Sequence, residues 1–230
     1  MSRIAIIPAR GGSKRIPRKN IKHFLGKPII AYSIKAALDS GLYDTVMVST
    51  DDEEIKRIAI EYGAEVPFLR SEKNADDYAT TVDVVLEVIA AYADQGSQFS
   101  QGTCLYPTAP LVTLDSLRES FKILNGTDAD TVITISSFSY PIERALKLES
   151  NKKVAFVHKE NIMKRSQDLQ TYYHDAGQFY TFDIPQLKIN QTLFAELTRA
   201  VILSELEVQD IDTLEDWKLA ELKYQAIHSE

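Results

Sequence analysis

The sequence has little cysteine and no long apolar run. Cys104 is the one cysteine among 230 residues, which excludes an internal disulfide and a cysteine-based metal cluster. No apolar run approaches the roughly 20 residues that a membrane helix needs. The apolar stretch near Met1 is also too short for a secretory signal. We therefore expect a cytoplasmic protein that has no membrane partner.

Three familiar motifs of nucleotide-binding and hydrolytic proteins are missing. The pattern G-x-x-x-x-G-K-[ST] is absent because Ser13 follows Gly12, and G-x-G-x-x-G is absent too, which argues against an NAD-dependent oxidoreductase. His174-Asp175 resembles part of a catalytic relay, but the chain has no G-x-S-x-G turn for a nucleophilic serine. A serine hydrolase is therefore disfavoured.

Acidic residues are missing from residues 1–38, which hold nine Lys or Arg. The rest of the chain holds 17 Lys or Arg against 33 Asp or Glu, and the net charge of the whole is −7. A cationic segment on an anionic body predicts a focused anion site and argues against a nucleic-acid partner.

The order of the predicted elements indicates one α/β domain over residues 1–230, an ordinary length for such a fold. Short apolar runs predict strands at 4–7, 46–48, 66–69, 103–106, 131–135 and 201–203. Helical periodicity predicts helices at 27–40, 55–62, 80–94, 114–124 and 212–227. This alternation favours a three-layer fold with a mostly parallel, Rossmann-like sheet. Ligands of such sheets bind at the carboxyl ends of the strands.

The alternation breaks at residues 138–185. Residues 145–148 and 154–158 are typical of a hairpin that turns at 151–153, and 178–182 is typical of a further strand. Because no flexible linker flanks this segment, we interpret it as an insertion within the domain, either a dimerisation arm or a lid.

The loop at residues 9–20 follows the first predicted strand and is rich in glycine and cations. Gly11 and Gly12 allow backbone N–H groups to approach a ligand closely. The cations of this loop are Arg10, Lys14, Arg15, Arg18 and Lys19. A triphosphate would neutralise this charge through backbone and side-chain donors. The alternative is a solvated surface loop, the usual fate of a charge run.

Asp210-Ile211-Asp212 lies between the last predicted strand and the last predicted helix. In extended backbone, the carboxylates of Asp210 and Asp212 face the same way, and Mg²⁺ takes one or two carboxylates together with substrate phosphates. The alternative is a capping box in which Asp212 is the N-cap and Glu215 stands at N3. Thr50 with Glu53 is a second predicted capping box.

Several segments together resemble the acylneuraminate-type cytidylyltransferases, which activate acidic 2-keto sugars as CMP derivatives. The opening IIPARGGSKRIPRKN resembles the signature of that family, and four further segments follow in the family's order. They are Val48-Ser49-Thr50-Asp51, Phe68-Leu69-Arg70, Pro107-Thr108-Ala109-Pro110 and Asp210-Ile211-Asp212-Thr213. The resemblance covers nearly the whole chain. It implies a nucleotide-diphospho-sugar transferase type of fold, a dimerisation arm and a homodimer.

The resemblance also implies site residues. The nucleotide-binding positions are Arg10, Gly11, Gly12, Ser13, Lys14, Lys19, Asn20, Arg70 and Thr81. Sugar-binding positions are Tyr106, Thr108, Arg144, His174 and Tyr180. Asp210 and Asp212 match the pair that binds Mg²⁺, and the catalytic residues expected are Arg10, Lys19 and Asp212.

Two segments are most similar to the pseudaminic acid branch of this family. Tyr106-Pro107-Thr108-Ala109-Pro110 stands where sialic acid enzymes usually carry Gln-Pro-Thr-Ser-Pro, and a segment at residues 173–180 replaces an Arg-Pro-Asn-Gly stretch. The resemblance implies transfer of CMP from CTP to the anomeric hydroxyl of a nine-carbon acidic sugar. N-acetylneuraminic and legionaminic acid are the alternative substrates. A nucleotide-sugar-binding protein without catalysis is the alternative from another class.

Overall fold

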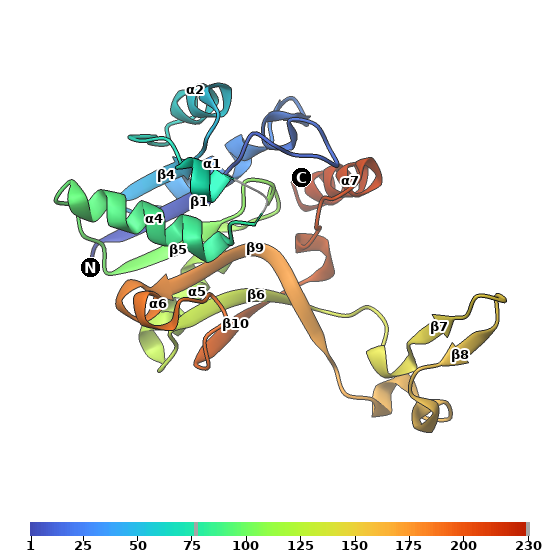
Figure 1. The fold of residues 1–230 in the computed structure, drawn as a ribbon. Coiled ribbons are helices and arrows are strands. Elements are labelled where there is room, and N and C mark those ends of the chain that lie inside the picture. The colour runs from blue at the N-terminus through green and yellow to red at the C-terminus, as the bar shows by residue number, and fades with distance from the viewer. Residues whose placement is uncertain (76–77, 229–230) are drawn as a thin grey trace.

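A central six-stranded sheet organises the computed structural model, which describes residues 1–75 and 78–228 (Figure 1). The strand order is β10-β6-β9-β5-β1-β4. The strands are β1 (Arg3–Pro8), β4 (Thr45–Ser49), β5 (Gln101–Leu105), β6 (Thr131–Ser137), β9 (Tyr173–Asp183) and β10 (Thr198–Leu203). β9 pairs antiparallel with both β5 and β6, and the other pairs are parallel. The mostly parallel α/β sheet predicted from the sequence is therefore confirmed.

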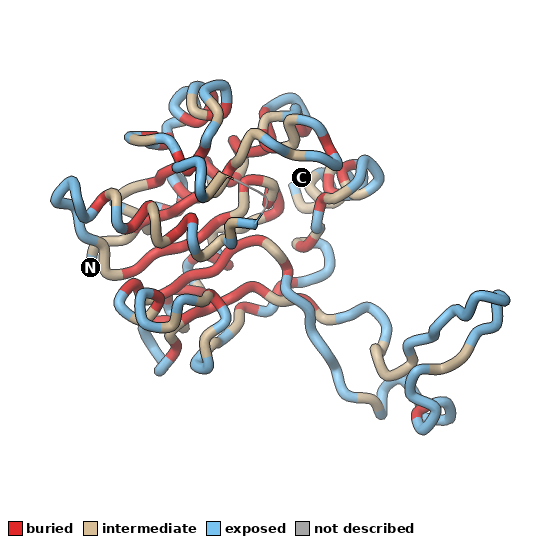
Figure 2. Tube along the Cα trace, viewed as in Figure 1, coloured by how far each residue is buried: buried red, intermediate tan, exposed pale blue. Residues whose placement is uncertain are grey.

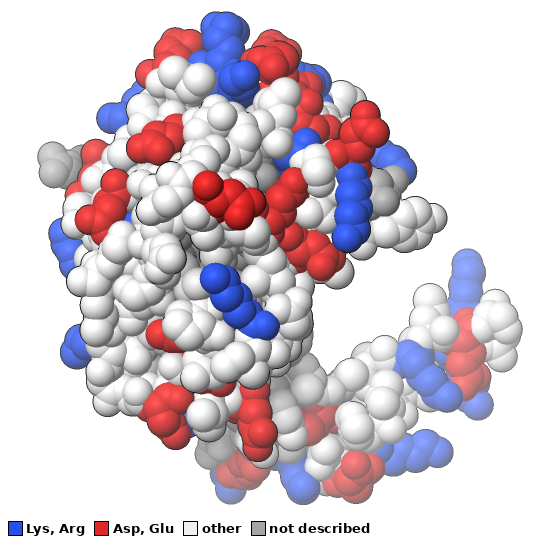
Figure 3. Space-filling model, turned by 60° about the vertical axis from the view of Figure 1, so that its left-hand side comes forward, with Lys and Arg blue, Asp and Glu red and all other residues white. Residues whose placement is uncertain are grey.

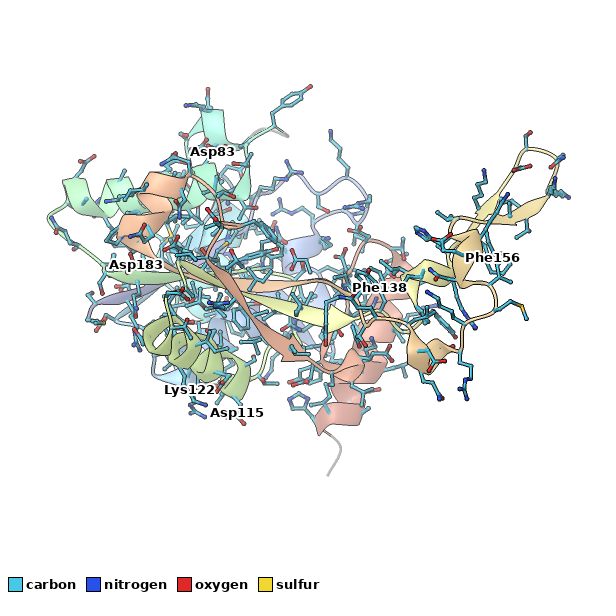
Figure 4. All side chains as sticks on the ribbon, turned by 90° about the horizontal axis from the view of Figure 1, so that it is seen from below. Asp83, Asp115, Lys122, Phe138, Phe156 and Asp183 are labelled. Atoms are coloured by element: carbon cyan, nitrogen blue, oxygen red, sulfur yellow. The ribbon has the colours of Figure 1, made fainter. Side chains whose placement is uncertain are left out.

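Helices cover both faces of this sheet. The helices are α1 (Ile30–Ser40), α2 (Glu53–Glu61), α3 (Glu72–Ala75), α4 (Thr81–Asp94), α5 (Leu114–Gly126), α6 (Ile184–Asn190) and α7 (Leu214–His228). The described residues also form short 3₁₀ helices, η1 (Lys19–Ile21), η2 (Ile142–Arg144), η3 (Lys159–Asn161), η4 (Ser166–Asp168) and η5 (Glu205–Glu207). Asp83 of α4 and Asp115 of α5 mark opposite sides of the sheet in Figure 4. The fold thus has three layers.

The buried side chains divide between the two faces because successive strand residues point in opposite directions. Ala5 and Ile7 of β1 pack with α1, α2 and α5, whereas Ile4 and Ile6 pack with α4 and α6. All four are fully buried. Buried residues accordingly follow the sheet in Figure 2.

The structure differs from the predicted elements at residues 66–69 and 184–190, among other places. Residues 66–69 form no strand, because the chain there makes only a single bridge between Met47 and Glu65 before it turns away. Helix α6, absent from the predicted elements, begins after Asp183, whose carboxylate accepts the backbone N–H of Gln186. Pro185 in its first turn suits a helix start, where a missing N–H costs nothing.

A protruding arm contains the predicted hairpin. Strands β7 (Leu146–Leu148) and β8 (Val154–Phe156) pair antiparallel, and Figures 1 and 3 show them standing away from the body. Phe138 marks the place in Figure 4 where the chain leaves the sheet. Residues 173–183, which the sequence placed in the insertion, form β9 in the middle of the main sheet.

A separate apolar cluster fixes α7 against the first loop. Phe24 packs edge-on against Trp217 and Tyr224 with ring centroids 5.7 and 5.8 Å apart. Ile16 and Ile211 are buried in the same cluster. This contact brings the segment that precedes α7 beside the loop that follows β1, although about 190 residues separate them in sequence. A short two-stranded hairpin, β2 (His23–Phe24) with β3 (Lys27–Pro28), supports the cluster.

Within residues 1–75 and 78–228, every helix is too short or too polar to span a membrane.

Candidate active site

A cavity of about 640 Å³ opens beside the ends of β1 and β5. Its lining combines five cations with hydroxyl, amide and aromatic groups. The residues are Pro8, Arg10, Ser13, Lys14, Arg15, Lys19, Asn20, Arg70, Asn74, Ala79, Thr80, Thr81, Val84, Tyr106, Pro107 and Thr108. Nine residues that the sequence singled out for ligand binding meet here: Arg10, Ser13, Lys14, Lys19, Asn20, Arg70, Thr81, Tyr106 and Thr108.

The glycine loop is held against β4 and the start of α2. The N–H of Gly11 donates to Asp51 Oδ1 at 3.0 Å, and Asn20 Nδ2 donates to the carbonyl of Arg10 at 2.9 Å. A Cβ on Gly11 would lie 2.8 Å from Asp52 Oδ2, whereas a Cβ on Gly12 would have no heavy atom within 4 Å. Gly11 is therefore required for close packing, and Gly12 has open space beside it.

Lys19 joins the first loop to the segment before α7. Its Nζ donates to the Ile211 carbonyl at 2.6 Å and lies 3.8 Å from Asp212 Oδ1. Burial lowers the pKa of Lys19, and the charges of Asp212 and Asp210 oppose that shift. Lys19 is thus a cation partly withdrawn from water, where its charge interacts strongly with an anion.

The Asp212 carboxylate forms a salt bridge with Arg15 and does not cap the helix as predicted. The predicted box of Asp212 with Glu215 is wrong by one residue. Asp216 instead accepts the N–H groups of Asp212 and Thr213, and Thr213 Oγ1 accepts the N–H of Asp216. The Asp212 carboxylate is therefore available for cations at the edge of the site.

The positive charge of Arg18 is neutralised by two carboxylates of the protein. Its guanidinium donates to Asp52 Oδ2 at 2.5 Å and to Glu54 Oε2 at 2.5 Å. Asp52 also caps α2 by accepting the N–H groups of Glu54 and Ile55, so the predicted Thr50–Glu53 box is wrong. Hydrogen bonds from Arg18 lower the pKa of Asp52 to about 2. Arg18 therefore braces the loop rather than lining the cavity.

Arg70 forms a buried part of the cavity wall. Only 9% of the residue is exposed, and its guanidinium donates to Ser49 Oγ at 3.1 Å and to the Ser49 carbonyl at 2.5 Å. Burial lowers the pKa of Arg70. Because two neutral acceptors of β4 fix this side chain, it presents a rigid positive charge near the cavity.

The N-terminus of α4 closes another side of the cavity. Thr80 caps the helix and forms a capping box with Asp83, which places Thr80 and Thr81 on the lining. Helix N-termini favour anions through their free N–H groups and dipole. The sequence reasoning missed Thr80 and Asn74. The T-x-x-D pattern at residues 80–83 is the signal that identifies Thr80.

Tyr106 stands over the buried Tyr180 at the cavity floor. Their ring centroids are 5.6 Å apart, and the Tyr106 hydroxyl lies 3.5 Å from Thr81 Oγ1. Tyr180 is 3% exposed and donates its hydroxyl proton to Asp175 Oδ2. Burial raises the pKa of both tyrosines, so both hydroxyls keep their protons at neutral pH.

Seven of the predicted residues are not among the lining residues of this cavity: Gly11, Gly12, Arg144, His174, Tyr180, Asp210 and Asp212. His174 and Asp210 line a second hollow beside η5, and the His174 ring packs edge-on against Phe138. Arg144 lies at the base of the arm, where its guanidinium contacts the Lys164 carbonyl and donates to Ser166 Oγ at 3.4 Å. Gly11 and Gly12 belong to the loop but are not among the lining residues.

A magnesium ion held by Asp210 and Asp212 would have to share its ligands with a substrate. Within the described part of the chain, no group of three or more His, Cys, Asp or Glu could hold a metal ion. Mg²⁺ commonly takes one or two carboxylates and completes its shell with phosphates and water. Asp210 and Asp212 lie two positions apart, and both act electrostatically on Lys19. The donor set therefore suits Mg²⁺ only together with a phosphate ligand.

The fold and the cavity together define an α/β protein with a cationic site beside the ends of β1 and β5, which suits a phosphorylated ligand. The sequence profile of the family described as cytidylyltransferase matches residues 4–223. The chain therefore belongs to the cytidylyltransferase family, whose members are CTP-dependent nucleotidyltransferases.

Two relatives agree with this assignment, and a solved structure has a similar fold. The chain is 41% identical over 228 residues to pseudaminic acid cytidylyltransferase of Campylobacter jejuni, covering 99% of this chain and 98% of the relative. It is 33% identical to CMP-N,N'-diacetyllegionaminic acid synthase of Legionella pneumophila, covering 95% and 94%. The fold is similar to that of CMP:2-keto-3-deoxy-manno-octonic acid synthetase complexed with CTP. That likeness has a TM-score of 0.71, 16% identity and full coverage of both chains.

Proposed function

We propose that this enzyme transfers CMP from CTP to the anomeric hydroxyl of pseudaminic acid, a nine-carbon acidic 2-keto sugar, and releases pyrophosphate. The cationic cavity carries the proposal, because Arg10, Lys14 and Lys19 converge there with the N-terminus of α4. The substrate class is supported by the identity to the Campylobacter jejuni relative and by Tyr106 on the cavity wall. The single buried cysteine supports a cytoplasmic location.

The side chains promote the transfer by stabilising negative charge on the phosphates. Arg10 and Lys19 bind the triphosphate and stabilise the negative charge that grows on the departing pyrophosphate. The anomeric hydroxyl loses its proton as its oxygen bonds to the α-phosphorus, and the bond from that phosphorus to pyrophosphate breaks. Partial burial of Lys19 strengthens its interaction with the phosphates because little water screens it.

Mg²⁺ is the proposed metal, with Asp210 and Asp212 as its protein ligands. When bound, Mg²⁺ would supply positive charge that offsets the charge of the phosphates. Arg15 would leave Asp212 as the metal binds, and its side chain is 67% exposed and free to move into water. The contact from Lys19 to the Ile211 carbonyl keeps the carboxylate segment beside the first loop.

The direct test is pyrophosphate release by the purified protein. The four nucleoside triphosphates are each combined with pseudaminic, N-acetylneuraminic, legionaminic and deoxy-octulosonic acids, with and without Mg²⁺. We expect release only with CTP, pseudaminic acid and Mg²⁺ together. Release with CTP and another acid would keep the reaction and overturn the choice of sugar. A protein that binds CTP but is silent with every acid would contradict catalysis.

A homodimer built through the arm is the proposed assembly. The arm exposes large apolar side chains, including Leu148 (71%), Val154 (55%) and Met163 (91%). Such apolar surface is typical of an interface, and we infer that a second copy of the chain covers it. Light scattering after gel filtration tests this. Leu148→Lys should yield monomers at concentrations where wild type is dimeric, while Ile60→Lys, on exposed α2, should not. A monomeric wild type would refute the proposal.

A further inference from the structure

Glu87 of α4 joins that helix to the short segment that follows Arg70. Oε1 of Glu87 accepts the N–H of Ser71 at 2.8 Å, and Oε2 accepts a hydrogen bond from Asn74 Nδ2 at 2.7 Å. None of residues 72–75, which form α3, is buried, so apolar packing does little to fix this segment. The carboxylate of Glu87 therefore holds residues 71–74 against α4.

The segment held in this way forms part of the cavity wall. Asn74 lines the cavity together with Arg70, and Val84 of α4 lines it as well. Glu87 comes three positions after Val84, on the same face of the helix, but it is not itself a lining residue. Glu87 therefore stands behind the wall and acts on a ligand through Asn74.

The charge of Glu87 fixes which end of the Asn74 amide points toward it. Burial raises the pKa of Glu87, but the hydrogen bonds from Asn74 and Ser71 outweigh burial and keep that pKa below its usual value. The group is thus a carboxylate at neutral pH, and a carboxylate can only accept hydrogen bonds. Asn74 must point Nδ2 toward Glu87, behind the wall. Its carbonyl oxygen Oδ1, an acceptor, is the end left for a ligand.

The proposed function already assigns two other parts of the cavity. The cations of the first loop bind the triphosphate, and Tyr106 stands on the wall assigned to the acid sugar. Asn74 belongs to neither part, because it comes from the segment between β4 and α4. The nucleoside is the portion of CTP that is left for Asn74. Cytosine presents an exocyclic amino group, a donor, where uracil presents a carbonyl oxygen.

We propose that Asn74 is a specificity-determining residue for the base and that Glu87 is its positioning residue. Oδ1 of Asn74 accepts a hydrogen bond from the amino group of cytosine. The carbonyl oxygen of uracil would face the same acceptor without a hydrogen bond, so the cavity selects CTP over UTP. The inference rests on the proposed function, which names CTP as the nucleotide, and it adds the residues that choose the base.

Glu87→Gln reverses the Asn74 amide with little change of shape. The amide oxygen of the new side chain keeps the bond from the Ser71 N–H, a fixed backbone donor, so its NH₂ group faces Asn74. Asn74 must then turn Oδ1 toward position 87 and Nδ2 toward the base. Calorimetric titration with CTP and with UTP, each with Mg²⁺ and without sugar, measures the result. We expect the preference for CTP, taken as the ratio of the two Kd values, to fall about tenfold or more. The midpoint of thermal unfolding should stay within about 2 °C of wild type.

A double-mutant cycle with Asn74→Ala separates positioning from a structural role. Asn74→Ala alone should also lose the preference for CTP, because the acceptor is gone. Adding Glu87→Gln to this variant should change neither Kd further, because Glu87 acts on the base only through Asn74. The matched control is Glu72→Gln, an exposed carboxylate of the same segment, which should leave the preference for CTP unchanged.

The outcomes are distinct. An unchanged preference for CTP in Glu87→Gln or in Asn74→Ala overturns the inference and leaves the proposed function intact. An equal loss from Glu87→Gln in wild type and in Asn74→Ala also overturns it, since the bond to Ser71 would then account for the loss. A wild type that binds CTP selectively but releases no pyrophosphate with any acid sugar would overturn the proposed transfer and leave the inference standing.

Discussion

Gly11→Ala should destabilise the protein because the new methyl group collides with Asp52. The added Cβ would lie 2.8 Å from Oδ2, 3.2 Å from Cβ and 3.3 Å from Cγ of that residue. Asp52 cannot turn aside cheaply, since it caps α2 and pairs with Arg18. Overpacking costs about 1–3 kcal/mol, and loss of the cap about 1 kcal/mol. We therefore expect the free energy of unfolding to fall by about 2–4 kcal/mol.

Urea unfolding followed by circular dichroism measures this loss, and Gly12→Ala is the matched control. A Cβ on Gly12 would meet no heavy atom within 4 Å, so that variant should unfold within about 0.5 kcal/mol of wild type. The midpoint of thermal unfolding should fall by about 5–10 °C in Gly11→Ala alone. Equal stability of the two variants would refute the reasoning, because it would show that the loop moves away from Asp52 at no cost.

Three further predictions follow from the site. Asp212→Ala should reduce pyrophosphate release about 100-fold or more while the protein stays folded, and near-normal turnover would remove Asp212 from the metal site. Lys19→Ala should also cut kcat sharply in the same assay, and an unchanged rate would exclude it from phosphate binding. Asp52→Asn tests the pH dependence of stability. Hydrogen bonds from Arg18 hold the folded pKa of Asp52 near 2, below its ordinary value of about 4. Its contribution is therefore present above pH 4 and lost as pH falls toward 2. Urea unfolding of wild type and Asp52→Asn should converge over that window, and a constant difference would contradict the assigned pair.

Local patterns predicted the longer helices and most strands because each carries its own periodicity. Ile4 to Ile7 formed the expected buried strand, and the hairpin of the arm formed where its turn residues indicated. The pattern failed at residues 66–69. An apolar run indicates only that a segment is buried. Whether the segment pairs as a strand depends on a neighbouring strand with free hydrogen-bonding groups.

Helix caps were predicted at the right places but on the wrong residues. The box expected at Asp212 formed one residue later, on Thr213 with Asp216, and the one expected at Thr50 gave way to Asp52. Several acceptors near a helix start can satisfy the same free N–H groups. The surrounding chain decides among them, and here the Asp212 carboxylate forms a salt bridge with Arg15.

The sequence by itself determined the alternation of strands and helices, the cationic glycine loop and its place after a buried strand. These follow from spacing and residue type, which are local. Tertiary structure alone decided that β9 enters the middle of the sheet, that Lys19 meets Ile211, and that Asp175 reaches Tyr180 through a bulge. Such contacts depend on packing between segments far apart in the chain. For example, the packing of Phe24 against Trp217 holds the segment before α7 beside the first loop. No pattern within either segment specifies its partner.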